Sequence, residues 1–398
     1  MENTNPLLNR KNDHRLKAIP FPEFKTEHFL PAIQEALKDA KAEIETLKNN
    51  PEAPTFENTI LELELNGELL DYVANIYFNL LSAESDDAFK ALAQQISPML
   101  AEFGSSIATD PLIFQRVKAV YDLEVAETPK PKIPKDLNDK EALMKAERYR
   151  LIERTYNSFI RGGAMLNEAD KKRLTEIQME ASQLSPKFSD NVLAATNKWE
   201  LHITDPQDVE GIPENSLKAA AYLAKKKGKD SGWLFNLQPS SLTPVLTYCK
   251  NREIRKQIQQ AYSSRAFRDD FDNQENIKKI LKLRAEKAKL LGYKNHADYV
   301  LADRMAASFE TASDFLEKIY GIAYPAAQKE VEAVKTLAKA MDNLDELMPW
   351  DMAYYSNKLK EQLYAYDPEE LRPWFKVENV LEGLFTVTGK IYGIQVKQ

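Results

Sequence analysis

Apolar residues recur at helical spacing along most of the chain. The first clear stripe lies between residues 25 and 49 and comprises Leu30, Ile33, Ala36, Leu37, Ala40, Ile44 and Leu47. This period places the side chains on one face of a helix, which can pack against a core. After Pro51 and Pro54, Thr55 is placed to cap a second helix. Residues 73–81 of that helix are apolar nearly all round, which predicts deep burial on all sides.

Two short segments alternate instead. In residues 198–204, KWELHIT, every second side chain is apolar, and residues 232–238, GWLFNLQ, repeat the pattern. Alternation is typical of strands, and we expect a small antiparallel pair with fewer than about a tenth of all residues in strands. Between them, Lys225, Lys226 and Lys227 precede Gly228, which favours a helix C-terminus over a nucleic-acid patch. The predicted fold is mainly α and multi-helix.

Later helices carry clear start and stop signals. Thr311 opens a helix that we expect to run through Met341 with a bend at Pro325. Asp367 is placed to cap another helix. A last helix spans about 377–392 and ends at Gly393, and residues 394–398 have the composition of half a strand.

Prolines divide the chain. Pro129, Pro131 and Pro134 deny helix to residues 127–139, which we interpret as a Pro-rich linker after an N-terminal helical domain, 1–126. Residues 140–240 then form a helical segment with the strand pair. Residues 241–398 form the last domain.

Composition excludes several functions. The 398 residues carry a net charge of −7, which argues against binding to nucleic acid or to an anionic membrane. No stretch approaches the roughly 18 apolar residues of a membrane span, and the N-terminus lacks a signal-peptide core, so we expect a cytoplasmic protein. The single cysteine, Cys249, cannot form an internal disulfide and is interpreted as a small core residue.

No catalytic motif stands out. His14, His28, His202 and His296 are scattered, and neither H-E-x-x-H nor its inverted form occurs, so no residue is predicted as a metal ligand. Neither G-x-S-x-G nor G-x-G-x-x-G is present. We therefore predict no catalytic residue and no cofactor in this chain.

Several segments nevertheless match one family in order. They include NPLL, IPFPEF, EHFLPAI and PTFENTI near the start, and the match is strongest from YSSRAF at 262–267 to RMA at 304–306. It continues through residues 349–394. The chain resembles the thimet oligopeptidase / oligopeptidase A / peptidyl-dipeptidase family of zinc metallopeptidases, and the bacterial peptidyl-dipeptidase branch is the most similar.

The resemblance implies two helix-rich lobes around a deep channel with a zinc ion on its floor, which admits short peptides. In the family, the H-E-x-x-H motif lies downstream of the last matching segment. We therefore expect an incomplete architecture: an N-terminal portion whose residues 241–398 begin the peptidase catalytic domain without the zinc site. The chain would be inactive until the missing C-terminal catalytic region is supplied, and zinc is expected only in the full-length parent. The alternative is a non-catalytic peptide-binding or scaffold protein derived from the same family.

Four residues fit a family signature, W-D…Y-Y: Trp350, Asp351, Tyr354 and Tyr355. Tyrosines offer a peptide a flat apolar face and a polar tip, so these are candidates for the wall of the substrate channel. The alternative is that they buttress a helix. If a region is missing, we further expect Leu381, Leu384, Phe385 and Ile391 to be exposed.

Overall fold

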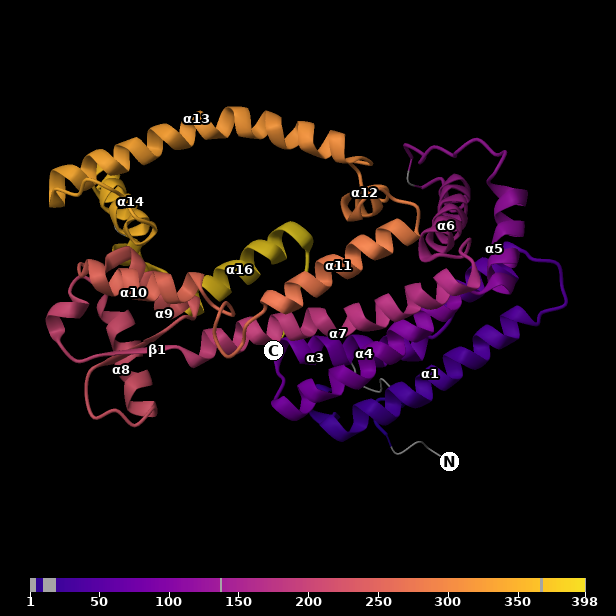
Figure 1. The fold of residues 1–398 in the computed structure, drawn as a ribbon, viewed down its shortest axis with the longest axis horizontal. Coiled ribbons are helices and arrows are strands. Elements are labelled where there is room, and N and C mark those ends of the chain that lie inside the picture. Colours follow the sequence, from indigo (N-terminus) through magenta and orange to yellow (C-terminus); the bar gives the residue numbers. More distant parts are fainter. Residues whose placement is uncertain (1–4, 10–18, 137, 366–367, 398) are drawn as a thin grey trace. The chain divides into compact units, whose positions relative to one another are not determined.

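The computed structural model describes residues 5–9, 19–136, 138–365 and 368–397, and they are predominantly helical (Figure 1). The chain divides into two compact units. The first comprises Met1–Ser189 and Glu275–Phe309, and the second comprises Asp190–Gln274 and Glu310–Gln398. Each unit is therefore discontinuous in sequence. The predicted division at 1–126, 127–139, 140–240 and 241–398 stays a prediction.

The elements of the first unit are helices. They are α1 (Thr26–Lys48), α2 (Glu62–Leu65), α3 (Glu68–Ala83), α4 (Asp87–Ala108), α5 (Pro111–Glu124), α6 (Lys140–Gly162), most of α7 (Glu168–Lys198), α11 (Gln274–Leu290) and α12 (His296–Leu301). A 3-10 turn, η1 (Phe21–Glu23), precedes α1, and a π-helical turn, η2 (Phe56–Leu61), precedes α2.

The second unit combines helices with a two-stranded sheet. Its elements are β1 (Glu200–Ile203), η3 (Pro206–Val209), α8 (Glu214–Lys226), β2 (Trp233–Asn236), α9 (Pro239–Tyr248), α10 (Arg252–Ser263), α13 (Phe309–Asp342), α14 (Pro349–Tyr364), α15 (Pro368–Leu371), η4 (Arg372–Trp374) and α16 (Val377–Tyr392). Among the described residues, these two strands form the sheet. The prediction of a mainly α fold with a small antiparallel pair is confirmed.

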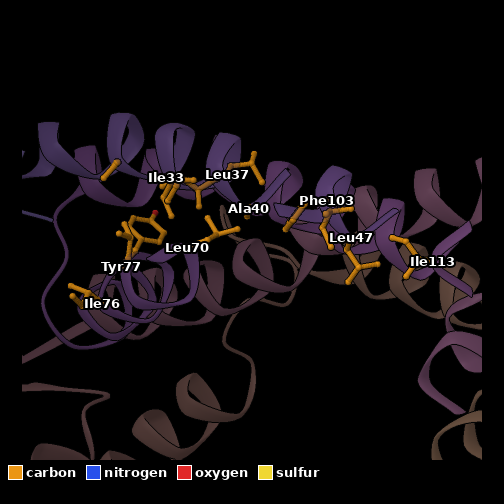
Figure 2. Close-up of a cluster of buried hydrophobic side chains, with 14 of the residues drawn as sticks. Ile33, Leu37, Ala40, Leu47, Leu70, Ile76, Tyr77, Phe103 and Ile113 are labelled. Carbon is orange, nitrogen blue, oxygen red and sulfur yellow. The ribbon is translucent and has the colours of Figure 1, made fainter. Parts of the chain in front are cut away.

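The core of the first unit forms where α1 contacts α3 and α4 (Figure 2). The predicted stripe of α1 is buried except for Leu30, which is half-buried, and Ile33 is fully inaccessible to solvent. Three aromatic rings meet beside it, because Phe29 and Phe89 lie 5.1 Å apart and Tyr77 lies 4.9 Å from Phe89, centroid to centroid. The Tyr77 hydroxyl donates to the Phe89 carbonyl at 3.1 Å, so its polar tip is satisfied inside the core.

Burial of residues 73–81 is one-sided, which corrects the sequence prediction. Val73, Ile76 and Tyr77 are buried, but Phe78 is 39% exposed. A helix on the edge of a core buries only the stripe that faces its neighbours, even where its outer face is also apolar.

The strand pair has the expected register, with Leu201 opposite Phe235 and Ile203 opposite Trp233. Gly232, just before β2, has φ +86°, and a Cβ there would lie 2.3 Å from the Ile203 carbonyl oxygen. Only glycine fits this approach. The lysine run is a helix end, as predicted: α8 stops at Lys226, and Gly228 has φ +73°.

The C-terminal elements agree with the sequence prediction in part. α13 begins at Phe309, before the predicted Thr311, and continues through Pro325 as a curved helix (Figure 1). α16 ends at Gly393, in the left-handed region, as expected. Residues 394–397 form no strand, so that prediction was wrong; an extended segment is a strand only when it pairs with another. The proposed cap Asp367 lies outside the described residues.

Candidate functional site

The four signature residues lie in the first two turns of α14. Pro349 occupies the first helical position, where its missing N–H is no loss. The backbone N–H of Met348 donates to Oδ2 of Asp351 at 3.0 Å. This bond, and the negative charge of Asp351 near the positive end of the helix dipole, both favour starting the helix here.

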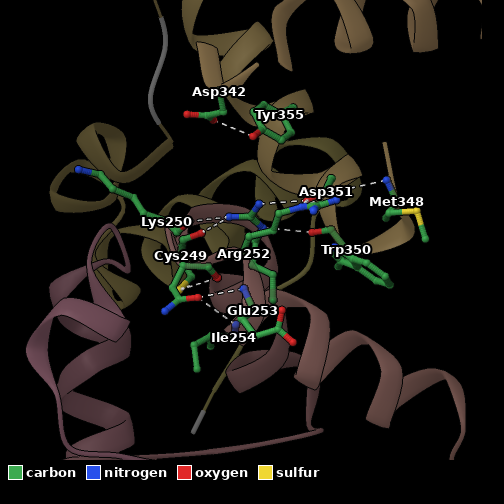
Figure 3. A network of polar contacts seen from close by, with 12 residues as sticks. Cys249, Lys250, Arg252, Glu253, Ile254, Asp342, Met348, Trp350, Asp351 and Tyr355 are labelled. Carbon is green, nitrogen blue, oxygen red and sulfur yellow. Dashed lines mark hydrogen bonds and ion pairs between the residues drawn. The ribbon is translucent and has the colours of Figure 1, made fainter. Parts of the chain in front are cut away.

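Asp351 is fully buried and binds two arginines of α10 (Figure 3). Arg252 donates from Nε to Oδ1 at 2.9 Å and from Nη2 to Oδ2 at 2.7 Å, a bidentate pair. Arg255 donates from Nη2 to Oδ1 at 3.1 Å. Because residues three apart share a helix face, α10 directs both guanidinium groups at one carboxylate.

Arg255 is itself only 1% exposed. Its Nη1 donates to the carbonyl oxygens of Cys249 at 2.8 Å and Lys250 at 3.0 Å, and its Nε donates to that of Trp350 at 3.2 Å. The guanidinium carbon lies 4.2 Å from the centre of the Tyr354 ring. A buried arginine stays charged, so Asp351 and these carbonyl groups together compensate its removal from water.

The electrostatics of the network hold each group in one protonation state. Burial alone would raise the pKa of Asp351, but hydrogen bonds from Arg252, Met348 and Arg255 outweigh it and lower the pKa below its usual value. The Tyr355 hydroxyl donates to Asp342 at 2.7 Å. Burial, reinforced by that bond, raises the pKa of Tyr355. Neither group is therefore tuned to exchange protons near neutral pH.

Trp350 differs from its three neighbours because it is only half-buried. Its indole nitrogen is buried and has no hydrogen-bond partner in the part of the chain that the structure describes. The ring lies 5.8 Å from the Arg252 guanidinium carbon and 5.7 Å from the Lys256 amine. Asp351, Tyr354 and Tyr355 are buried, and α14 packs against α9 and α10. A channel-wall role for the four residues stays a prediction.

The described residues offer no fit to a zinc ion. Across residues 5–9, 19–136, 138–365 and 368–397, no group of three or more His, Cys, Asp or Glu side chains could hold a metal. His28 accepts a hydrogen bond from the Lys25 N–H at Nδ1, and His202 contacts the Ser231 carbonyl. His14 lies outside the described residues. No chemical step through a metal can be built from these side chains.

Cys249 is a buried core residue, as the sequence indicated. Burial raises the pKa of its thiol, and the Sγ lies 3.3 Å from the Asp208 carbonyl oxygen. A protonated, inaccessible thiol is a poor nucleophile.

Comparison with known proteins supplies the family. Residues 245–398, which include α10, α14 and α16, match the model of peptidase family M3. Oligopeptidase A of Salmonella typhimurium is 32% identical over 400 residues, covering 99% of this chain and 56% of the relative. Dipeptidyl carboxypeptidase of Escherichia coli is 31% identical over 398 residues, with the same coverage. Organellar oligopeptidase A of Arabidopsis thaliana is 33% identical over 386 residues, 47% of its length. Residues 245–398 of this chain belong to peptidase family M3.

Membership of peptidase family M3 confirms the resemblance seen in the sequence. The identities to oligopeptidase A and to dipeptidyl carboxypeptidase differ by one percentage point, so identity does not assign this M3 chain to either branch. The chain spans about half the length of the curated relatives it matches. None of its described helices is both long enough and apolar enough to cross a bilayer.

Proposed function

We propose that this chain supplies the helical, metal-free part of a zinc oligopeptidase of family M3 that hydrolyses short peptides. Support comes from relatives named oligopeptidase A and dipeptidyl carboxypeptidase, which align with 99% of the chain. Because the described side chains do not fit zinc, the metal ligands of such an enzyme would come from the part of the relatives that this chain does not match. In this proposal α14 and its four signature residues belong to the wall of the substrate channel, where the half-buried Trp350 can reach a peptide and the three buried residues support it.

The observation that carries the proposal is the exposure of α16. This helix has no buried residue, although it carries several large apolar side chains. Leu381, Leu384, Phe385 and Ile391 are 44%, 52%, 43% and 66% exposed. Their exposure was expected from the sequence. The first half of α13 is similar, with Phe315, Leu316, Ile319, Tyr320, Ile322 and Tyr324 all exposed. Fully burying one such side chain contributes about 1.5–3 kcal/mol, so faces of this kind are usually covered by a partner.

We assign these faces to the remainder of an M3 peptidase. The alignment with oligopeptidase A leaves 44% of the relative unmatched (100 − 56), which is ample to cover two helices. Leu381, Leu384 and Ile391 recur at helical spacing, so one stripe of α16 could pack on such a partner. The α16 face, defined by Leu381, Leu384, Phe385 and Ile391, is therefore the proposed docking surface.

Complementation tests the proposal. The chain is mixed with the unmatched part of Escherichia coli oligopeptidase A, and cleavage of a quenched fluorescent short peptide is followed with zinc or with a chelator. Each polypeptide alone serves as the control. We expect neither to cleave alone and the mixture to cleave in a chelator-sensitive manner. Chelator-insensitive cleavage by this chain alone would overturn the proposal. A zinc-loaded complex that binds the peptide without cleaving it would favour the alternative, a non-catalytic peptide-binding or scaffold protein.

The substrates, location and partners that we propose for this chain are based on its relatives. We propose short peptides as substrates, a cytoplasmic location, and no binding to nucleic acid or membranes. One relative, from Arabidopsis thaliana, is named probable cytosolic oligopeptidase A, whereas another from the same plant is named chloroplastic/mitochondrial. Cell fractionation with an antibody to the chain distinguishes the two locations.

A further inference from the structure

A cavity lies within the first unit. It has a volume of about 270 Å³ and is lined by residues from α6, α7, α11 and α12 and the turn after α12. Its wall carries four cations, Arg150, Arg154, Arg161 and Lys287, against one carboxylate, Asp303. This is a concentration of positive charge in a chain whose net charge is −7. We call it the basic cavity.

Most of this positive charge is not neutralised by the protein. Arg150 pairs with Glu153 at 2.7 Å. Among the described residues, no carboxylate lies within ion-pairing distance of Arg154, Arg161 or Lys287. Three cations without an ion-pair partner therefore line one small space that holds a single carboxylate, Asp303, an excess of positive charge that attracts an anion.

The aromatic ring of Tyr299 holds two of these cations in place. The guanidinium carbon of Arg161 lies 4.6 Å from the ring centre, and the amine of Lys287 lies 5.2 Å from it. Cation–π attraction uses the flat face of a guanidinium group and leaves its N–H donors unused. One of them, Nη1 of Arg161, is buried and has no hydrogen-bond partner among the residues described. Burying a donor without an acceptor is costly, and a ligand oxygen would satisfy it.

The pKa of His296 is affected by the same group of positive charges. Its ring lies 6.2 Å from that of Tyr299, and its Nδ1 is buried without a partner in the described parts of the chain. Burial lowers the pKa of His296, and the charges of Arg284 and Lys287 lower it further. An anion in the basic cavity would oppose this and raise that pKa, which provides an independent readout of binding.

We propose that the basic cavity binds the phosphate group of a small anion. A phosphate carries up to two negative charges and several acceptor oxygens, which suits three uncompensated cations better than a single carboxylate does. Asn157, Ser158 and Gln178 line the same cavity and offer neutral polar groups to the remaining oxygens. No residue that lines the basic cavity belongs to the arginine–aspartate network.

Calorimetric titration at constant ionic strength tests this site with three probes: inorganic phosphate, inorganic pyrophosphate and adenosine monophosphate. We expect saturable binding of one anion per chain. Tighter binding of adenosine monophosphate would identify a phosphate ester, and tighter binding of phosphate or pyrophosphate would identify a free anion. The chemical shift of His296, followed by NMR across a pH series, should show a higher pKa when the anion is bound.

Matched variants locate the binding. Arg154→Gln removes an exposed cation of the cavity and should weaken binding roughly tenfold, the size expected for one charge-assisted contact. Lys145→Gln removes an exposed cation from the same helix outside the cavity and should leave binding unchanged. Because both positions are exposed, both variants should fold. No saturable binding of any probe, or equal weakening by both variants, would overturn the proposal.

Discussion

Two helices of equal length, α3 and α16, have similar apolar character and opposite surroundings. Both span 16 residues and carry an apolar stripe at helical spacing. α3 buries Leu70, Val73, Ile76 and Tyr77 against its neighbours, whereas α16 buries none of its residues. A helical pattern thus defines which face of a helix can be buried, but not whether the covering partner is present among the described residues.

The difference also separates two kinds of stabilisation. The side chains of α3 contribute to folding of the chain itself, because unfolding would return them to water. Those of α16 are already in water and contribute only when a partner covers them. Substitutions should therefore act on stability in the first region and on association in the second.

The largest contrast should come from two phenylalanines. Phe29 is 1% exposed and packs among aromatic rings, whereas Phe385 is 43% exposed. Phe29→Ala should lower the free energy of unfolding by about 3–5 kcal/mol, since it removes buried contacts and leaves a cavity. Phe385→Ala should change it by less than about 0.5 kcal/mol. Urea unfolding followed by circular dichroism measures both variants. Equal losses of unfolding free energy would contradict the difference between the buried and the exposed region.

A somewhat smaller loss is expected in the polar core of the second unit. Asp351→Ala leaves Arg255 buried without its carboxylate and should destabilise the chain by about 3 kcal/mol. This is the lower end of the usual range because Arg252 is 43% exposed and can turn to water. Asp270→Ala, which removes an exposed partner of Lys198, is the matched control and should have little effect. Similar losses of unfolding free energy in the two variants would show that the cost of removing a carboxylate does not depend on its burial.

The pH dependence of the same carboxylate gives a subtler effect. Because the folded-state pKa of Asp351 is lowered, its stabilising contribution is present above the unfolded value of about 3.9 and is lost as pH falls toward the folded pKa. The stability difference between the wild-type chain and Asp351→Asn should therefore shrink as the pH is lowered from 6 to about 2. Denaturant unfolding at several pH values measures it. If the stability difference between the two chains grew as the pH fell, folding would raise the pKa of Asp351 and not lower it, which would contradict the account.

The sequence predicted local structure well and long-range pairing poorly. Helical periodicity located α1 and α16, and alternation located both strands, because these patterns depend on neighbours within a few residues. Residues 394–397 were misjudged because strand pairing is not local. The same limit applies to the site: a signature indicated Asp351, but Arg252 and Arg255, which bind it from about a hundred positions away, were missed. The i, i+3 spacing of the two arginines indicates that they share a helix face, but it does not indicate which residue they bind.

The most direct test of the account is the affinity of the unmatched part of Escherichia coli oligopeptidase A for this chain. Binding to the wild-type chain is compared by sedimentation with binding to two variants. Leu384→Glu places a charge on the α16 face, and Met144→Glu places one on α6 at another exposed apolar side chain. We predict a one-to-one complex that Leu384→Glu weakens about a hundredfold, as expected when a charge is buried without a partner, and that Met144→Glu leaves intact. Equal affinity for all three chains, or no complex between folded partners, would contradict the account.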